Sequence, residues 1–177
     1  MKGKDNQSLI LDTSILIGGF DPNDIDVEQY ITPQVKDELQ EKSVLLTRVQ
    51  TAVEAGRLKV EEAEPKFSEI VLKKASKIGD SLFLSQTDLA LLALALQLKE
   101  KGKNPIILTE DYSMQNVASL LGINFTSIST FGIKYRYKWT LYCPACGKMY
   151  PPNKNFSVCM ICGVKLKSKI SEKERLR

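Results

Sequence analysis

The stretch LILDTSILI, residues 9–17, decides the fold of the amino-terminal part of the chain. Leu9, Ile10 and Leu11 predict a buried strand, and Asp12 follows them directly. An isolated ionised carboxylate is very costly in an apolar interior. Asp12 is therefore expected to be paired, bound to a metal, or placed at the end of its strand, and the surrounding sequence has to decide which.

Helical and strand patterns alternate on the carboxyl-terminal side of this stretch. Thr32 and Pro33 form an N-cap followed by proline at the first helical position, which predicts a helix through residue 42. Further helices are expected over residues 43–55, 66–78, 85–100 and 112–121, and strands over residues 58–60, 104–111 and 123–128. This alternation predicts an α/β fold with a mainly parallel central sheet.

The composition excludes several kinds of chemistry. The chain of 177 residues contains no histidine, which excludes Ser-His and Cys-His nucleophiles and histidine-based metal sites. The longest apolar run, residues 89–98, is too short to cross a bilayer, and residues 1–8 lack the apolar segment of a signal peptide. We therefore expect a soluble, cytoplasmic protein without a membrane partner, in which carboxylates, lysines and bound metals carry any catalysis.

The charge is divided unevenly along the chain. Residues 134–177 contain 11 Lys and Arg and 2 Glu, a net charge of +9, whereas residues 1–133 carry 14 basic and 19 acidic residues, a net charge of −5. A basic carboxyl-terminal part predicts a polyanionic partner.

Four acids are expected at one edge of the sheet, where the carboxyl ends of parallel strands meet helix starts: Asp12, Glu38, Asp88 and Asp111. Each also has an ordinary structural explanation. Asp12 could cap the next segment, Glu38 could be a solvated helix residue, Asp88 completes a capping box with Ser85, and Asp111 could be an N-cap.

Taken together, the acids favour a metal site. Two carboxylates about 4 Å apart repel each other by about 4 kcal/mol at an effective dielectric constant near 20. A divalent cation removes this repulsion, and Mg²⁺ and Mn²⁺ prefer carboxylate and water oxygens. Such a metal suits the hydrolysis of a phosphodiester.

Four segments resemble the PIN-domain nucleases: LDTSIL, TPQVKDEL, LSQTDLALLALAL and LTEDYSMQNVA, within residues 8–130. The resemblance implies a three-layer PIN-like fold in which Asp12, Glu38, Asp88 and Asp111 are catalytic and bind Mn²⁺ or Mg²⁺. It also implies supporting hydrogen bonds from Thr13 and Thr109. Asp80 and Glu110 are further carboxylates near this edge, and both fit the pattern less well.

A second metal site is predicted near the carboxyl terminus. Its four cysteines form two C-x₂-C pairs separated by twelve residues: Cys143, Cys146, Cys159 and Cys162. Each pair is followed by a glycine, which allows a tight turn. Four thiolates at this spacing suit one structural Zn²⁺ ion in a small zinc ribbon. Two disulfides are the alternative, and nothing in the sequence signals export to an oxidising compartment.

The segments that flank the cysteines are basic. KYRYKW and VKLKSKI alternate cationic with apolar residues, which predicts strands with one cationic face. The predicted RNA-binding residues are Lys134, Arg136, Lys138, Lys148, Lys154, Lys165, Lys167 and Lys169. Ordinary solvated strand faces are the alternative. We expect the tail at residues 171–177 to be frayed.

A PIN-like domain at residues 1–130 followed by a basic zinc ribbon at residues 131–177 resembles the Nob family of endoribonucleases. The resemblance implies cleavage of pre-rRNA at the 3′ end of the small-subunit (16S) rRNA during ribosome biogenesis, with small-subunit ribosomal or assembly proteins as further partners. The alternative is a non-catalytic assembly factor that binds rRNA. A toxin-type PIN nuclease is disfavoured because that class lacks a zinc ribbon.

Overall fold

The computed structural model describes residues 6–40, 43–127, 135–151 and 156–175. A five-stranded sheet has the order β3-β2-β1-β4-β5, and all of its pairs are parallel. Its strands are β1 (Gln7–Leu11), β2 (Glu28–Ile31), β3 (Leu58–Val60), β4 (Asn104–Leu108) and β5 (Asn124–Thr126). The predicted α/β fold with a parallel sheet is confirmed, although the sequence did not predict β2.

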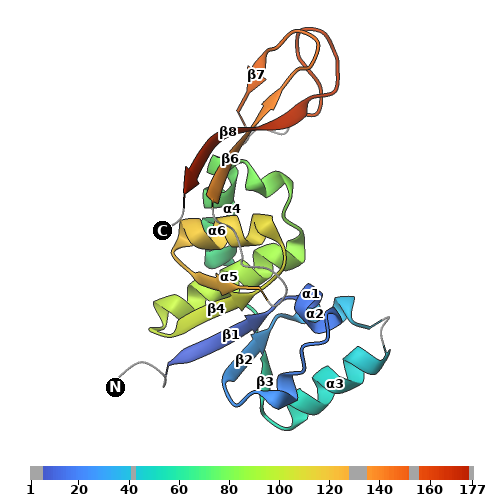
Figure 1. Ribbon diagram of the computed structural model, residues 1–177, viewed down its shortest axis with the longest axis vertical. Coiled ribbons are helices and arrows are strands. Elements are labelled where there is room, and N and C mark those ends of the chain that lie inside the picture. Colours follow the sequence, from blue (N-terminus) through green and yellow to red (C-terminus); the bar gives the residue numbers. More distant parts are fainter. Residues whose placement is uncertain (1–5, 41–42, 128–134, 152–155, 176–177) are drawn as a thin grey trace.

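Helices connect these strands, as Figure 1 shows. They are α1 (Thr13–Ile17), α2 (Pro33–Glu38), α3 (Ser43–Glu54), α4 (Pro65–Ile78), α5 (Gln86–Glu100) and α6 (Tyr112–Leu121), with short 3₁₀ helices η1 (Pro22–Asp24) and η2 (Asp80–Leu82). Helix α2 ends four residues earlier than predicted, because the amide of Leu39 bonds back to Lys36 in a tightened last turn. Likewise β4 ends at Leu108, because the following residues form the start of α6.

The core lies between the sheet and the helices. Helix α5 contributes most to it, with five consecutive residues at positions 91–95 that are fully buried. A helix that is apolar on nearly every side is expected in such a central place. Helix α4 instead buries one stripe, which consists of Phe67, Val71, Ala75 and Ile78. It ends where Gly79 adopts a positive φ of 84°, a conformation that favours glycine.

The carboxyl-terminal part forms a separate antiparallel sheet of three strands, drawn in orange and red in Figure 1. It consists of β6 (Tyr135–Tyr142), β7 (Met149–Tyr150) and β8 (Lys167–Arg175), with β6 in the centre. The prediction of a frayed tail is wrong as far as Arg175, because β8 pairs with β6 along its whole length. The predicted boundary between residues 130 and 131 lies outside the described residues. In the described parts of the chain, every helix is too short or too polar to span a bilayer.

The order of the strands determines where a ligand can bind. The chain runs outward from β1 through β2 to β3, then crosses back to β4 on the other side of β1. The carboxyl ends of β1 and β4 therefore flank a topological switch point, which is where open α/β sheets bind ligands.

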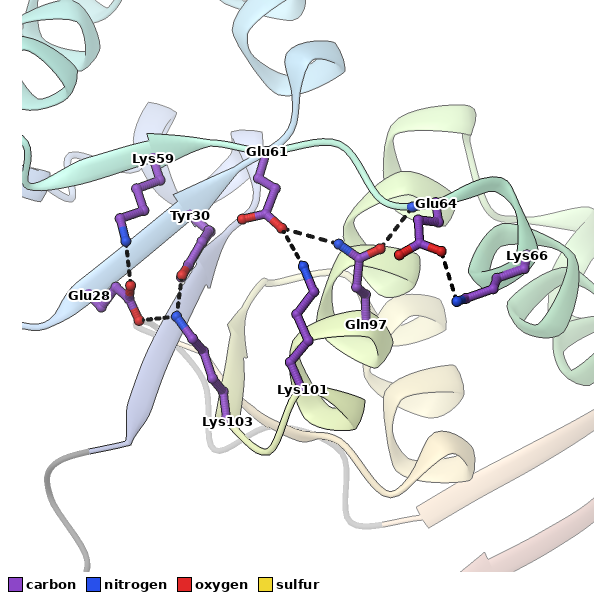
Figure 2. Close-up of polar contacts among 9 residues, drawn as sticks. All are labelled: Glu28, Tyr30, Lys59, Glu61, Glu64, Lys66, Gln97, Lys101 and Lys103. Carbon is purple, nitrogen blue, oxygen red and sulfur yellow. Dashed lines mark hydrogen bonds and ion pairs between the residues drawn. The ribbon is translucent and has the colours of Figure 1, made fainter.

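A network of charged residues closes the opposite end of the sheet, near the amino ends of the strands (Figure 2). Glu28, the first residue of β2, accepts hydrogen bonds from Lys59 and Lys103, and Lys103 also donates to the hydroxyl of Tyr30. The hydrogen bonds from Lys103 and then Lys59 are the main causes that lower the pKa of Glu28 to about 2. This network ties β2 and β3 to the turn that precedes β4.

We predict that Glu28→Gln destabilises the fold at neutral pH. A carboxylate with a lowered pKa stabilises the folded state above its unfolded pKa, and that contribution is lost as the pH falls toward the folded value. The Glu28 side chain is 32% exposed, so we expect a loss of about 1–2 kcal/mol. Urea unfolding should show this difference in the free energy of unfolding at about pH 7, and a smaller difference at about pH 3. An equal difference at both pH values would contradict the prediction, and Glu69→Gln, at an exposed position of α4, is the matched control.

Candidate active site and metal centres

Asp12 lies at the switch point, directly after β1. Its backbone amide donates to the carbonyl oxygen of Leu108 in β4 at 3.1 Å, and the residue is only 6% exposed. Oδ2 accepts hydrogen bonds from Ser14 Oγ at 2.6 Å and from Thr109 Oγ1 at 2.8 Å. Although Asp12 occupies the N-cap position of α1, its carboxylate accepts no backbone hydrogen bond from that helix. Helix capping therefore does not account for this residue.

Glu38 ends α2 and is held by two threonines from other elements. Thr13 Oγ1 donates to Glu38 Oε2 at 2.6 Å, and the hydroxyl of Thr87 donates to Oε1. Thr13 follows Asp12 in the sequence and Thr87 precedes Asp88, so Glu38 is brought beside both acids. Thr87 was not predicted from the sequence, although the pair Thr87–Asp88 repeats the pairing of a threonine with an acid at residues 12 and 13.

Asp88 performs two tasks at the start of α5. It completes the predicted capping box, because its Oδ2 accepts from the Ser85 amide at 2.7 Å and its own amide donates to Ser85 Oγ at 3.1 Å. Burial is the main cause that raises its pKa, and the negative charges of Asp12 and Asp111 raise it further. Asp88 therefore caps its helix and also lies within electrostatic reach of the other two acids.

Asp111 is joined to Asp12 through Thr109. Its Oδ1 accepts from the Met114 amide at 2.9 Å, so it is the N-cap of α6. Its own amide donates to Thr109 Oγ1 at 3.0 Å, and that hydroxyl in turn donates to Asp12. Thr109 is fully buried, which fixes the position of the hydroxyl between the two acids.

The four acids share one edge of the sheet without a cationic partner. Within the part of the chain that the structure describes, none of them forms an ion pair with a lysine or arginine. Among the described residues, only the cysteines bring three or more ligand atoms within 4.8 Å of one another, so the four acids form a looser group than the cysteines do. A divalent cation such as Mg²⁺ can be held through one or two carboxylates together with several waters.

The four cysteines form a compact cluster at the far end of the second sheet. Their sulfur atoms all lie within 4.8 Å of one another, and none is in a disulfide. The distances are 3.3 Å between the sulfurs of Cys143 and Cys162 and 3.6 Å between those of Cys146 and Cys159. Tetrahedral zinc with Zn–S bonds of about 2.3 Å separates its ligands by about 3.8 Å, so the cluster fits this ion.

The backbone shapes each cysteine pair in the same way. The amide of Gly147 donates to the Cys143 carbonyl at 2.9 Å, and that of Gly163 donates to the Cys159 carbonyl at 2.8 Å. Both glycines have positive φ values, 74° and 68°. The predicted tight turn behind each C-x₂-C pair is therefore present.

Tyr150 of β7 supports the cysteine cluster, and no pattern in the sequence pointed to it. Its hydroxyl lies 3.1 Å from Cys159 Sγ and accepts from the Met160 amide at 2.9 Å. The hydrogen bond from Tyr150 is the main cause that lowers the pKa of Cys159 to about 6. A hydroxyl that stabilises the thiolate also orients this sulfur for a metal.

The predicted RNA-binding residues are only partly described. Lys148, Lys165, Lys167 and Lys169 are exposed on the second sheet and its turns. Lys138 forms an exposed ion pair with Glu172 across the strands at 2.6 Å, which offsets its charge. Lys134 and Lys154 lie outside the described residues, and of Arg136 only the backbone, in β6, is described.

Comparisons with known proteins agree with this architecture. Residues 9–98 match a family model described as the PIN domain of ribonuclease. The chain is 35% identical over 159 residues to endoribonuclease Nob1 of Methanothermobacter thermautotrophicus, covering 89% of this chain and 90% of that protein. It is 36% identical over 168 residues to endoribonuclease Nob1 of Methanocaldococcus jannaschii, covering 95% and 80%.

A shorter similarity links the chain to ribonuclease VapC1 of Thermoplasma acidophilum, with 40% identity over 111 residues, or 62% of this chain and 53% of that protein. The similarities to the Nob1 proteins extend over most of both chains, and the four-cysteine cluster lies in the carboxyl-terminal part. With a parallel PIN-type sheet and this cluster, the chain belongs to the Nob1 family of endoribonucleases.

Proposed function

We propose that this protein cleaves pre-rRNA at the 3′ end of the small-subunit rRNA by hydrolysis of one phosphodiester. The observation that carries the proposal is the group of four acids at the switch point without a lysine or arginine partner among the described residues. Such a group needs positive charge from outside the described fold, and a divalent cation together with the reacting phosphate meets that need. The similar Nob1 proteins are endoribonucleases, which supports cleavage of RNA as the reaction.

In this proposal Asp12 and Asp111 bind the principal Mn²⁺ or Mg²⁺ ion, and Glu38 and Asp88 complete the site or orient water. Such an ion supplies Lewis-acid activation of water and stabilises charge on the phosphate. Thr109 and Ser14 both donate to Oδ2 of Asp12, which directs Oδ1 toward a ligand. Thr13 and Thr87 each donate to one oxygen of Glu38, which fixes the orientation of that carboxylate. The expected products are a 3′-hydroxyl and a 5′-phosphate.

The proposal assigns binding of RNA to the basic carboxyl-terminal part, residues 131–177, as a unit distinct from residues 1–130. An acidic nuclease domain repels a polyanion, and the charge of +9 on residues 134–177 offsets that repulsion. Lys148, Lys165, Lys167 and Lys169 are the strongest candidates, because Lys138 is paired with Glu172. The four cysteines would hold one structural zinc ion in this unit.

The test is cleavage of a labelled RNA that spans the 3′ end of the small-subunit rRNA precursor. We expect the zinc-loaded protein with Mn²⁺ to cut this RNA at one position and to leave an RNA of equal length and scrambled sequence intact. Omission of Mn²⁺ should abolish the product, because the acids then lack their counter-charge. Binding of the precursor without cleavage under all metal conditions would instead indicate a non-catalytic assembly factor.

A further inference from the structure

A buried carboxyl group lies where the second sheet meets the PIN domain. Asp80 begins η2 and has no exposed surface. Its Oδ2 accepts a hydrogen bond from Asn116 Nδ2, while Oδ1 receives no hydrogen bond of standard geometry from the described residues. A buried carboxyl group with one oxygen left without a partner is costly, so its presence needs a reason.

The second sheet reaches this carboxyl group through Trp139. Trp139, in β6, lies close enough to Asp80 for its indole N–H to lower the pKa of this carboxyl group, although the two groups form no hydrogen bond of standard geometry. Its ring also packs on Phe83, just after η2, with ring centroids 5.2 Å apart and planes inclined by 56°. A tilted aromatic pair with a half-buried indole beside a buried carboxyl group is a specific contact rather than incidental packing. Figure 1 shows the start of β6 beside α4 and α6, and both helices contact it.

Helix α6 connects this contact to the acids of the candidate active site. Asn116, which donates to Asp80, and Asp111, the N-cap of the same helix, are little more than one helical turn apart. Asp111 is also the charged group that acts on Asp80 through space. Asp80 thus accepts a hydrogen bond from the helix that Asp111 caps, and on its other side it lies near Trp139 of the second sheet.

The buried carboxyl group of Asp80 lowers the stability of the fold. Burial is the main cause that raises the pKa of Asp80 to about 7. The folded state therefore binds this proton more tightly than the unfolded chain does. As the pH rises from the ordinary aspartate pKa toward about 7, the group makes the fold progressively less stable. Residues that lower stability in this way are concentrated at functional sites.

We propose that Asp80 is a positioning residue, whose buried carboxyl group joins Trp139 of the second sheet to Asn116 of α6 and so holds the RNA-binding sheet in a fixed orientation to the four acids. This inference rests on the proposed function, because the orientation matters only if one RNA contacts both parts. An RNA held on the second sheet then enters the acid site in one register. A short RNA that contacts only the acids does not need the contact.

The first test measures the orientation without any cleavage. In the zinc-loaded full chain, ¹⁵N relaxation should give backbone amides of the second sheet and of the PIN domain the same rotational correlation time. We expect Asp80→Ala and Trp139→Phe to lower the value for the second sheet alone, while Asp80→Asn, which keeps an acceptor oxygen, stays close to wild type. Asp24→Ala, at an exposed aspartate, is the matched control. Unchanged values in both Asp80→Ala and Trp139→Phe would overturn the proposal.

The second test separates positioning from catalysis. We expect Asp80→Ala and Trp139→Phe to lower kcat/KM for a long precursor RNA roughly tenfold, as the loss of a hydrogen bond to a charged group predicts. For a short oligonucleotide cleaved at the acids alone, kcat/KM should change less than about twofold. Equal losses on both RNAs would overturn the positioning role. If the wild-type protein cleaves neither RNA, the proposed function fails, while the relaxation measurement still tests the contact. Should Asp80→Ala not fold, Trp139→Phe carries both tests, because it removes the indole N–H donor and keeps a smaller aromatic ring beside Phe83.

Discussion

Replacement of Asp12 by asparagine is expected to reduce RNA cleavage at least about 100-fold while the fold is retained. The structure gives Asp12 no capping role, and the residue lies 6% exposed at the switch point between β1 and β4. The substitution keeps the shape of the side chain and one oxygen for Ser14 and Thr109, but it removes the negative charge. A site built from carboxylates loses most of its affinity for a divalent cation when a central charge is lost.

The measurement compares single-turnover cleavage of the labelled precursor RNA by wild-type protein and Asp12→Asn in the presence of Mn²⁺. Asp37→Asn is the matched control, because Asp37 lies beside Glu38 on α2, is exposed, and accepts a hydrogen bond only from Gln40 among the described residues. We expect this control to cleave within about twofold of wild type. Cleavage by Asp12→Asn at the wild-type rate would exclude the carboxylate from the reaction.

Thermal unfolding distinguishes a catalytic loss from a folding defect. Asp12 has no lysine or arginine partner among the described residues, and its burial penalises the negative charge. We therefore expect Asp12→Asn to unfold at the wild-type temperature or slightly above it when Mn²⁺ and Mg²⁺ are absent. Clustered carboxylates usually behave in this way: neutralisation of one of them lowers the activity and raises the stability of the fold.

The second large effect is expected for Cys159→Ser, which should release the zinc ion and unfold the carboxyl-terminal sheet. Binding of structural zinc contributes about 10–16 kcal/mol of apparent free energy to the folding of such modules. The apolar core of this part is small, since its buried residues within the described ranges are Leu141, Cys143, Tyr150, Cys159 and Leu166. Two of these five are cysteines of the cluster, so the core cannot replace the metal.

We expect the purified variant to contain no stoichiometric zinc and to lose the dispersed amide resonances of β7 and of the cysteine turns. The resonances of the PIN domain should persist, because its core is a separate cluster of buried residues around α5. The affinity for the precursor RNA should fall, and the slope of log affinity against log salt should flatten, because disordered lysines no longer contact phosphates in a fixed pattern. Ser157→Ala, an exposed position between the cysteine pairs, is the matched control. Retention of zinc by Cys159→Ser with unchanged resonances would contradict the assignment of this sulfur as a ligand.

The sequence by itself predicted the features that depend on a few neighbouring residues. The spacing of the cysteines and their following glycines predicted a cluster that the structure forms, and Ser85 and Asp88 predicted the capping box that begins α5. The parallel sheet followed from the alternation of strand and helix patterns. These features depend on ligand spacing, backbone conformation and periodicity, which act over fewer than about twenty residues.

The tertiary structure alone decided which distant side chains meet. Strand β2 has only four residues and begins with Glu28 and Gln29, so it is defined by pairing with β1 and β3 rather than by its own pattern. The tail as far as Arg175 is a strand only because β6 pairs with it. In the same way, nothing near Glu38 in the sequence indicates Thr87, which lies 49 residues away.

The contact of Trp139 with Phe83, near Asp80, shows the same limit. Each residue has an unremarkable local sequence, and the contact exists because β6 packs against α4 and α6, which brings Trp139 to the segment that contains η2. The sequence by itself determined which residues can bind a cation or a zinc ion, since that depends on their chemical groups and their local spacing. The topology of the sheet determined which of them face one another, because parallel strands with crossover helices join residues that are far apart along the chain.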